Sequence, residues 1–379
     1  MRYKIPRHFG RYCRIIGVVL FVVCTVRVLF EYHSDGTSDR KEMYISNHSN
    51  SPYQKSDVPY LVDTETCKIP NINPFDPSVL LYLRQGRKIS CNKHLPITYE
   101  DGSRLCINWT AVDQSPWRET FGFCRYQAIY RPLNITDHDF YKYLEPSKEF
   151  NVSIEMKDDF VRVFCYTNGG GKIYTNYHQF ILLKDDVEAR CSKSFQKHKN
   201  NKDLRETLNV IMIGVDSISR LNFMRYMQKT RSYLLNDLEA VELTGYNKVA
   251  DNTFVNIVPM TLGKFLEEVP WNEKMNKTPF DNYNFIWKQF GSRGYRTLYA
   301  EDAPSIAIFD YLKAGFHKPP TDYFNRHFSV AMTADRKSWY NSHHCLVNKM
   351  ETEIMLDYVI NLYLYTNTVH TWLSPSLPD

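Results

Sequence analysis

The sequence predicts an α/β fold for the second half of this 379-residue chain, because short apolar runs alternate there with segments of helical periodicity. The run 208–215 carries no charge and is followed directly by Asp216, which is typical of a buried parallel strand. A second strand is expected at 295–300. Strands that alternate with helices favour a mainly parallel sheet.

Apolar residues recur at helical spacing over 222–238, 253–266 and 350–362. The first half of the chain shows a different pattern. Residues 160–166 alternate with a period of two, as in a half-buried strand, and 168–172 indicate a hairpin turn. A charged connector is expected at 193–205, before the α/β region.

The N-terminus has the charge and hydropathy pattern of a membrane anchor. Residues 1–14 contain five basic and no acidic residues, and the apolar segment 15–30 follows, interrupted by Arg27. A spanning helix needs about 20 residues, which this segment approaches if Arg27 extends to the far interface. Basic residues stay in the cytosol. We therefore expect a single-pass type II protein with a cytosolic tail (1–14), a polar stem (31–62) and its bulk in the Golgi lumen or outside the cell. A cleaved signal peptide is the alternative.

Sequons and cysteines favour an oxidising location for the bulk of the chain. Five N-x-Ser/Thr sequons follow the apolar segment, at Asn47, Asn108, Asn134, Asn151 and Asn276. The region 63–204 is rich in cysteine and contains Cys67, Cys91, Cys106, Cys124, Cys165 and Cys191. We expect three disulfides among these six, with the connectivity open, and no partner for Cys345. The net charge of +5 is spread thinly, so nothing indicates nucleic-acid binding.

Two side chains stand where phosphoryl or sulfuryl transfer would need them. Asp216 closes the first predicted strand, and ligands of open α/β sheets bind at the carboxyl ends of the strands. Thr253 begins the predicted helix 253–266, where backbone N–H groups and the helix dipole favour an anion. A carboxylate that holds a metal and a hydroxyl at an anion site together suggest a metal-dependent transferase or hydrolase. Either residue is alternatively a helix N-cap.

Four segments carry a resemblance to a known family, namely 210–220, 245–254, 294–302 and 320–323. They resemble the insect and nematode type II membrane proteins of unknown function that contain an alkaline-phosphatase-like, sulfatase-like domain. The resemblance implies an α/β/α sandwich over 205–379 with a bimetal centre of zinc or calcium. Asp216 would be a metal ligand. Thr253 would be the nucleophile and a second ligand, because Thr253-Phe-Val-Asn256 is similar to the Thr-Phe-Pro-Asn segment of nucleotide pyrophosphatase/phosphodiesterases.

The chain departs from that family pattern in two respects. Sulfatases convert a Cys or Ser to formylglycine, which Thr253 cannot form, so sulfoester hydrolysis is disfavoured. The family's later metal ligands, an Asp-His pair and a further His, have no counterpart before Asp379. We therefore expect a truncated sandwich without activity and, unless the site is completed, without a cofactor. Asn256 and Asp302 are expected at the edge of the site, and Asp302 is alternatively a helix cap.

Three functions are compatible with these patterns. The first is a membrane-anchored phosphoester hydrolase that acts on a phosphorylated, or less favourably a sulfated, extracellular substrate. The second is a binding protein of the same fold without catalysis. The third is a type II glycosyltransferase that holds manganese through Asp137 and Asp139. Metal content separates them: zinc or calcium for the first, none for the second and manganese for the third.

Overall fold

The computed structural model describes residues 18–24, 58–84, 86, 89–91, 94–133, 135–199, 208–335 and 344–372. The chain divides into two compact units, each built from non-consecutive segments. Unit 1 takes its residues from 1–24, 90–214 and 257–379, and unit 2 takes its residues from 25–89 and 215–256. The sequence instead suggests consecutive regions, 63–204 and 205–379.

Unit 1 contains a four-stranded sheet in the order β11 (Val210–Val215), β1 (Val18–Cys24), β12 (Arg296–Glu301) and β13 (Tyr323–Phe324). Strand β12 pairs in parallel with β1 on one side and with β13 on the other. All six residues of β12 are buried, so this strand is central. The strands predicted at 208–215 and 295–300 are thus confirmed, but the predicted burial holds only for β12, since Ile211 and Ile213 of β11 are 44% and 61% exposed.

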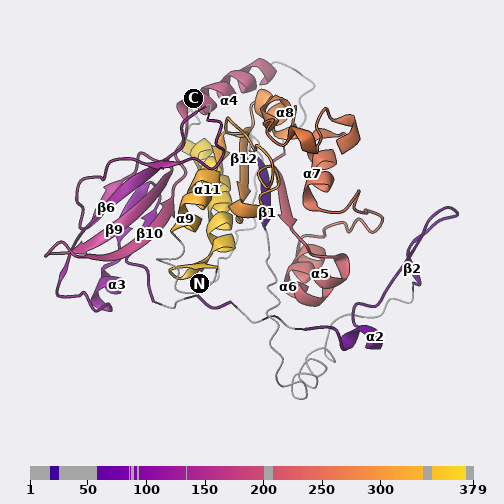
Figure 1. Cartoon of the computed structure of the whole chain (residues 1–379), viewed down its shortest axis with the longest axis horizontal. Helices are drawn as coiled ribbons and strands as arrows, with labels where there is room; N and C mark the ends of the chain where they lie inside the picture. Colours follow the sequence, from indigo (N-terminus) through magenta and orange to yellow (C-terminus); the bar gives the residue numbers. More distant parts are fainter. Residues whose placement is uncertain are drawn as a thin grey trace, which may run out of the picture. The chain divides into compact units, whose positions relative to one another are not determined.

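Helices contact both faces of β12. Leu298 and Ala300 belong to a core cluster with α9 (Arg326–Ala334) and α11 (Glu351–Trp372), which lie beside the sheet in Figure 1. Tyr299 points the opposite way, since successive strand residues alternate. Its ring contacts the ring of Trp287 in α8 (Ile286–Ser292), with the two ring centroids 5.6 Å apart. Unit 1 is therefore a mixed α/β structure.

A second sheet of unit 1 is antiparallel, in the order β10 (Lys172–Gln179), β9 (Phe160–Thr167), β6 (Phe121–Tyr130) and β7 (Lys142–Tyr143). Figure 1 shows β6, β9 and β10 side by side. Gly170 has a φ of 82° in the turn between β9 and β10, which confirms the predicted hairpin. One face of this sheet shares a core with β4 (Thr98–Asp101), β5 (Arg104–Ile107) and β8 (Ser153–Glu155). Helix α3 (Trp109–Asp113) follows β5.

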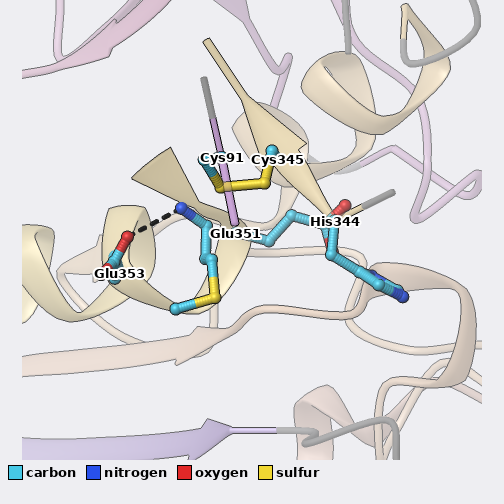
Figure 2. The surroundings of a disulfide bond; sticks show 6 residues. Cys91, His344, Cys345, Glu351 and Glu353 are labelled. Atoms are coloured by element: carbon cyan, nitrogen blue, oxygen red, sulfur yellow. Dashed lines mark hydrogen bonds and ion pairs between the residues drawn. A yellow bond between two sulfur atoms is a disulfide. The ribbon is translucent and has the colours of Figure 1, made fainter. Parts of the chain in front are cut away.

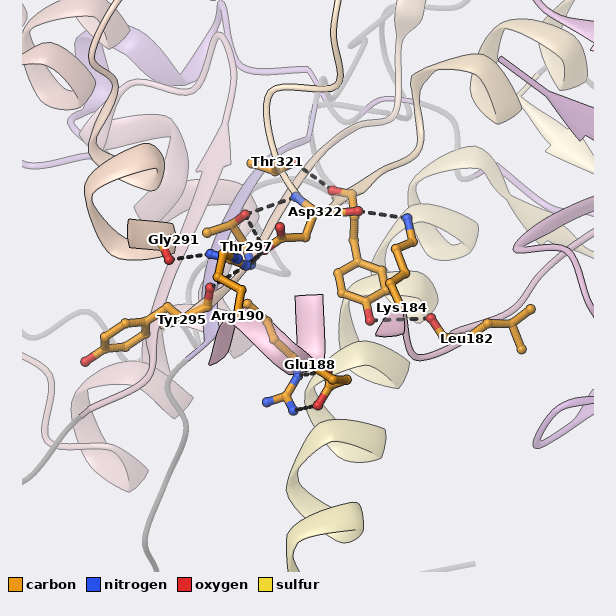
Figure 3. Close-up of polar contacts among 11 residues, drawn as sticks. Leu182, Lys184, Glu188, Arg190, Gly291, Tyr295, Thr297, Thr321 and Asp322 are labelled. Carbon is orange, nitrogen blue, oxygen red and sulfur yellow. Dashed lines mark hydrogen bonds and ion pairs between the residues drawn. The ribbon is translucent and has the colours of Figure 1, made fainter. Parts of the chain in front are cut away.

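Helix α4 (Asp185–Lys199) is fastened to β12 and β13 by ion pairs, as Figure 3 shows. Arg190 donates to Asp322 at 2.7 Å, and Asp322 accepts the Thr297 N–H at 2.8 Å. Fully buried Arg296 donates through Nε to Glu188 at 2.6 Å. The helix continues into the segment predicted as a connector, so that prediction is wrong for residues up to Lys199.

Two disulfides lie in unit 1, and they correct the predicted pairing. Cys124 bonds to Cys165 across β6 and β9. Cys91 bonds to Cys345, 254 positions away, beside the first turn of α11 (Figure 2). Cys345 is thus paired, and the prediction that it lacks a partner is wrong. Three bridges do not form among the six predicted cysteines, because Cys67, Cys106 and Cys191 are free thiols.

The pairing differs because the hairpin β14 (Cys345–Leu346) and β15 (Lys349–Met350) carries Cys345 into the buried interior. Cysteine spacing contains no information about such a tertiary contact.

Unit 2 consists of short elements. Strands β2 (Tyr60–Asp63) and β3 (Lys68–Pro70) form a hairpin, and α2 (Pro77–Leu80) follows. Next come α5 (Arg220–Tyr226), α6 (Gln228–Ser232) and a π-helical turn, Tyr233–Asp237. Helical structure is thus confirmed at 222–238, but the single helix that was predicted is broken at Met227, whose φ is −115° and ψ 39°. Arg225 joins the two parts of the unit by donating to the Pro74 carbonyl oxygen at 2.6 Å.

The predicted anchor is only partly covered by the described residues. Of segment 15–30, Val18–Cys24 is described, and it forms strand β1. The tail 1–14 and most of the stem 31–62 lie outside the described residues. Among the helices of the described segments, none combines the length and apolar composition that a membrane crossing requires.

Candidate active site

The structure brings Asp216 and Thr253 together within unit 2. Asp216 directly follows β11, and Thr253 is the first residue of α7 (Thr253–Leu262). The Thr253 hydroxyl donates a hydrogen bond to Asp216 Oδ1 at 2.8 Å, across 37 positions of sequence. Both side chains are half-buried. A hydroxyl in direct contact with a carboxylate is the arrangement that a nucleophile and its proton acceptor require.

The backbone beside each of these residues adopts a left-handed conformation. Ser217 has a φ of 58° and Asn252 a φ of 68°. Such conformations cost about 1–3 kcal/mol for ordinary residues and less for Asn. They persist only where the surroundings impose them, and here each lies directly next to one partner of the Asp216–Thr253 hydrogen bond. Sequence reasoning missed both positions, although an Asn directly before a helix is a usable signal.

The helix that follows Asp216 and the helix that begins at Thr253 are capped by other residues. The N-cap of α5 is Ser219, whose hydroxyl accepts the Asn222 N–H at 3.3 Å. At the start of α7, the Asn252 side chain accepts the Val255 N–H at 3.5 Å. The capping interpretation of both residues is therefore excluded. Thr253 stands in the first turn of a ten-residue helix, where N–H groups and the dipole favour an anion.

Asn256 holds the loop in front of Thr253. Its Oδ1 accepts the Val249 N–H at 2.7 Å, and its Nδ2 donates to the carbonyl oxygens of Ala250 at 2.8 Å and Asn252 at 2.6 Å. Both ends of the amide are thus bonded to backbone, and the side chain ties the loop 249–252 to the first turn of α7.

Asp302 belongs to unit 1, where it is buried and accepts the Thr352 hydroxyl at 2.6 Å. It lines a narrow cavity with Gln179, Asn325, Ser329 and Glu351, among others. The short helical turn after it is capped by Ala303, so the capping interpretation does not hold for Asp302.

Unit 1 also contains a buried ionic cluster that the sequence did not reveal. Arg326 donates to Asp139 at 2.5 Å and pairs with Asp310 at 3.1 Å. Burial raises the pKa of Glu301 to about 7, assisted by repulsion from Asp310, whose own pKa burial also raises. The Asp139 carboxylate, which the glycosyltransferase hypothesis assigns to manganese, thus lies beside Arg326 with its side chain 52% exposed.

The described residues contain no complete metal site. No set of three or more His, Cys, Asp or Glu side chains in the described residues is placed to hold a metal ion. The Asp216 carboxylate and the Thr253 hydroxyl place two oxygen atoms side by side, and oxygen is a ligand type that zinc and calcium accept.

The predicted glycosylation sites differ in their surroundings. Asn151 and Asn276 are exposed, whereas Asn108 is half-buried and caps α3 by accepting the Ala111 N–H at 3.2 Å. Asn47 and Asn134 lie outside the described residues.

Comparison with known proteins gives one result. No match is found among the curated proteins or among the solved structures. Residues 87–373 match a family model described as "Protein of unknown function (DUF229)". The match extends over parts of both units and includes Asp216 and Thr253. Because it covers well over half of the 379 residues, the chain belongs to the DUF229 family.

Proposed function

We propose that this chain is a hydrolase-like protein of the alkaline-phosphatase type, in which Thr253 is the nucleophile toward phosphate esters and Asp216 its partner, and in which full turnover requires metal ligands beyond these two residues. The observation that carries the proposal is the 2.8 Å hydrogen bond from Thr253, in the first turn of α7, to Asp216, which follows β11. The proposal includes a location in the Golgi lumen or at the cell surface; it leaves the anchor at 15–30 aside, because Val18–Cys24 of that segment pairs with β12 as strand β1. The two disulfides support the oxidising compartment.

The chemistry follows from the positions of the two side chains. Thr253 Oγ1 attacks phosphorus while its proton passes to Asp216 Oδ1, the bond from phosphorus to the leaving oxygen breaks, and that oxygen takes a proton from water to leave as the alcohol. The product is a phosphothreonine, which water later hydrolyses. Backbone N–H groups of the first helical turn face the negative charge that develops on the phosphoryl oxygens. A divalent cation held by Asp216 and Thr253 would lower the pKa of the hydroxyl and neutralise the phosphate.

Two protein oxygens are fewer than the four ligands of even a tetrahedral zinc site. We therefore expect slow turnover from these residues alone. Formation of the phosphothreonine is the step that tests the assignment, because it needs only the nucleophile and its partner.

The test uses the full chain in detergent with zinc or calcium chloride and 2,4-dinitrophenyl phosphate, whose good leaving group favours transfer. Mass spectrometry of the peptide that contains Thr253 should find one added phosphoryl group. Asp216→Asn should slow labelling by about 10²-fold, a typical contribution of a proton acceptor, and Thr253→Ala should abolish it.

Thr261→Ala is the matched control. Thr261 lies in the same helix, and its hydroxyl donates to the Ile257 carbonyl oxygen at 2.7 Å, so its loss should leave labelling unchanged. Absence of label from wild-type Thr253 with either metal, or equal labelling of Asp216→Asn, contradicts the proposal.

A further inference from the structure

Alternation along the antiparallel sheet of unit 1 gathers aromatic and basic side chains on one face. In the register of β6 and β9, Phe123 lies opposite Tyr166 and Arg125 lies opposite Phe164. On the next strand, Lys172 of β10 pairs with Tyr166. Directly opposed residues share a face of the sheet. These five residues, Phe123, Arg125, Phe164, Tyr166 and Lys172, form what we call the aromatic–cation face.

Rings and cations contact one another across this face. Phe123 and Tyr166 stack with ring centroids 5.3 Å apart and planes 25° apart. The Arg125 guanidinium lies over Phe123 at 5.4 Å, and the Lys172 ammonium lies over Phe164 at 4.9 Å. The contacts hold rings and charges in fixed positions, so a ligand would meet a preorganised surface.

The aromatic–cation face is exposed to solvent, although helices α9 and α11 cover another part of the same side of the sheet. Phe160 and Tyr177 are packed into the core with α9 and α11. By contrast, Lys172 is exposed and the four other residues of the face are half-exposed. Arg125 also pairs with Glu149 at 2.6 Å, but the two side chains are 42% and 49% exposed. Water screens such a pair, so an anionic ligand can compete for the guanidinium.

We propose that the aromatic–cation face binds an acidic glycan, a sugar chain with sulfate or carboxylate groups. The half-exposed rings offer apolar contact to the C–H groups of sugar rings, and Arg125 and Lys172 offer charge-assisted hydrogen bonds to sulfate or carboxylate. The inference does not depend on the function proposed for Thr253.

The compartment favours a glycan over the other polyanion that uses rings and cations, a single-stranded nucleic acid. The Cys124–Cys165 disulfide joins β6 and β9 on the opposite face of the sheet. Together with Cys91–Cys345 it indicates an oxidising environment. Acidic glycans are abundant there, whereas nucleic acids are not.

The test measures binding of the full chain to heparin, to chondroitin sulfate and to a single-stranded RNA oligonucleotide at about 0.15 M salt. Arg125→Ala and Lys172→Ala should each weaken glycan binding by about tenfold, the effect of losing one charge-assisted contact. Phe123→Leu removes a ring without a change in charge and should weaken binding by about threefold.

The control is Lys142→Ala. Lys142 lies over Tyr130 at 5.3 Å, and Tyr130 alternates with the residues of the aromatic–cation face, so this pair belongs to the other side of the sheet. Glycan binding within twofold of wild type is expected. An equal loss in Lys142→Ala and Lys172→Ala would show diffuse charge attraction and overturn the site. Tighter binding of the RNA than of either glycan would overturn the ligand, and unchanged binding by Phe123→Leu would overturn the role of the rings.

Discussion

The ionic network that fastens α4 in unit 1 and the Asp216–Thr253 site in unit 2 are held together in different ways. In the network, Arg296 is fully buried and bonds to Glu188, 108 positions earlier. In the site, Asn256 bonds to backbone atoms only four to seven positions away, and Asp216 and Thr253 remain half-buried. Buried long-range contacts are lost only when the unit unfolds, whereas short local hydrogen bonds open separately. We therefore expect stability to depend mainly on unit 1 and chemistry mainly on unit 2.

The largest expected effect is on the stability of unit 1. Phe285 is completely buried, and its ring stacks on Trp287 with centroids 4.3 Å apart. Phe285→Ala should lower the free energy of unfolding by about 3–5 kcal/mol, because it leaves a cavity in the aromatic core. Urea denaturation measures the loss. Tyr233→Ala in unit 2 is the comparison: its side chain is 55% exposed, and a change of under about 1 kcal/mol is expected. Equal losses would remove the contrast between the units.

A smaller effect, dependent on pH, is expected at Glu301. Its pKa is raised to about 7 in the folded chain, first by burial and then by repulsion from Asp310. The folded chain therefore binds this proton more tightly than the unfolded chain does. The resulting stabilisation is fully present below about pH 4.5 and is lost as the pH rises through 7.

Glu301→Gln keeps the neutral form at every pH and tests this sign. Relative to wild type, it should be nearly neutral at low pH and stabilising by about 3 kcal/mol at alkaline pH, from the size of the pKa change. Urea denaturation across the pH range measures the difference, with exposed Glu145→Gln as a control that should follow wild type. A difference that does not change with pH would mean that Glu301 does not titrate in this range.

The smallest effect on stability is expected for Asn256→Ala, which should nevertheless slow phosphoryl transfer to Thr253. Asn256→Ala removes three hydrogen bonds to the loop 249–252, in front of Thr253. We expect phosphoryl labelling of Thr253 to slow by about tenfold, because misplacing the nucleophile raises the barrier. The urea midpoint should change little, since the loop is exposed. Labelling at the wild-type rate would show that Asn256 does not position the site.

Local patterns predicted the parts of the fold that depend on local forces. The strand before Asp216 and the helix from Thr253 were predicted because apolar patterning is visible within a few residues. The burial expected of that strand was wrong, since Ile211 and Ile213 are 44% and 61% exposed. The Cys91–Cys345 bond and the burial of Arg296 depend on partners more than 100 positions away, which no local pattern records. The pairing of Asp216 with Thr253 was anticipated only as a chemical combination. Its geometry comes from the backbone at Ser217 and Asn252.

The apolar residues 18–24 show the limit of a local pattern most clearly. A run of seven apolar residues suits a buried parallel strand as well as it suits part of a membrane span. Only partners elsewhere in the chain or in the membrane decide between these structures.

The most direct test of the division between stability and chemistry compares two variants in two assays. Asp216→Asn and Phe285→Leu are each measured for the rate of phosphoryl transfer to Thr253 and for the urea midpoint. We predict that Asp216→Asn loses labelling and keeps the midpoint, while Phe285→Leu lowers the midpoint and keeps labelling under native conditions. Loss of labelling that follows the midpoint in both variants would contradict the account, because Asp216 would then act only through folding.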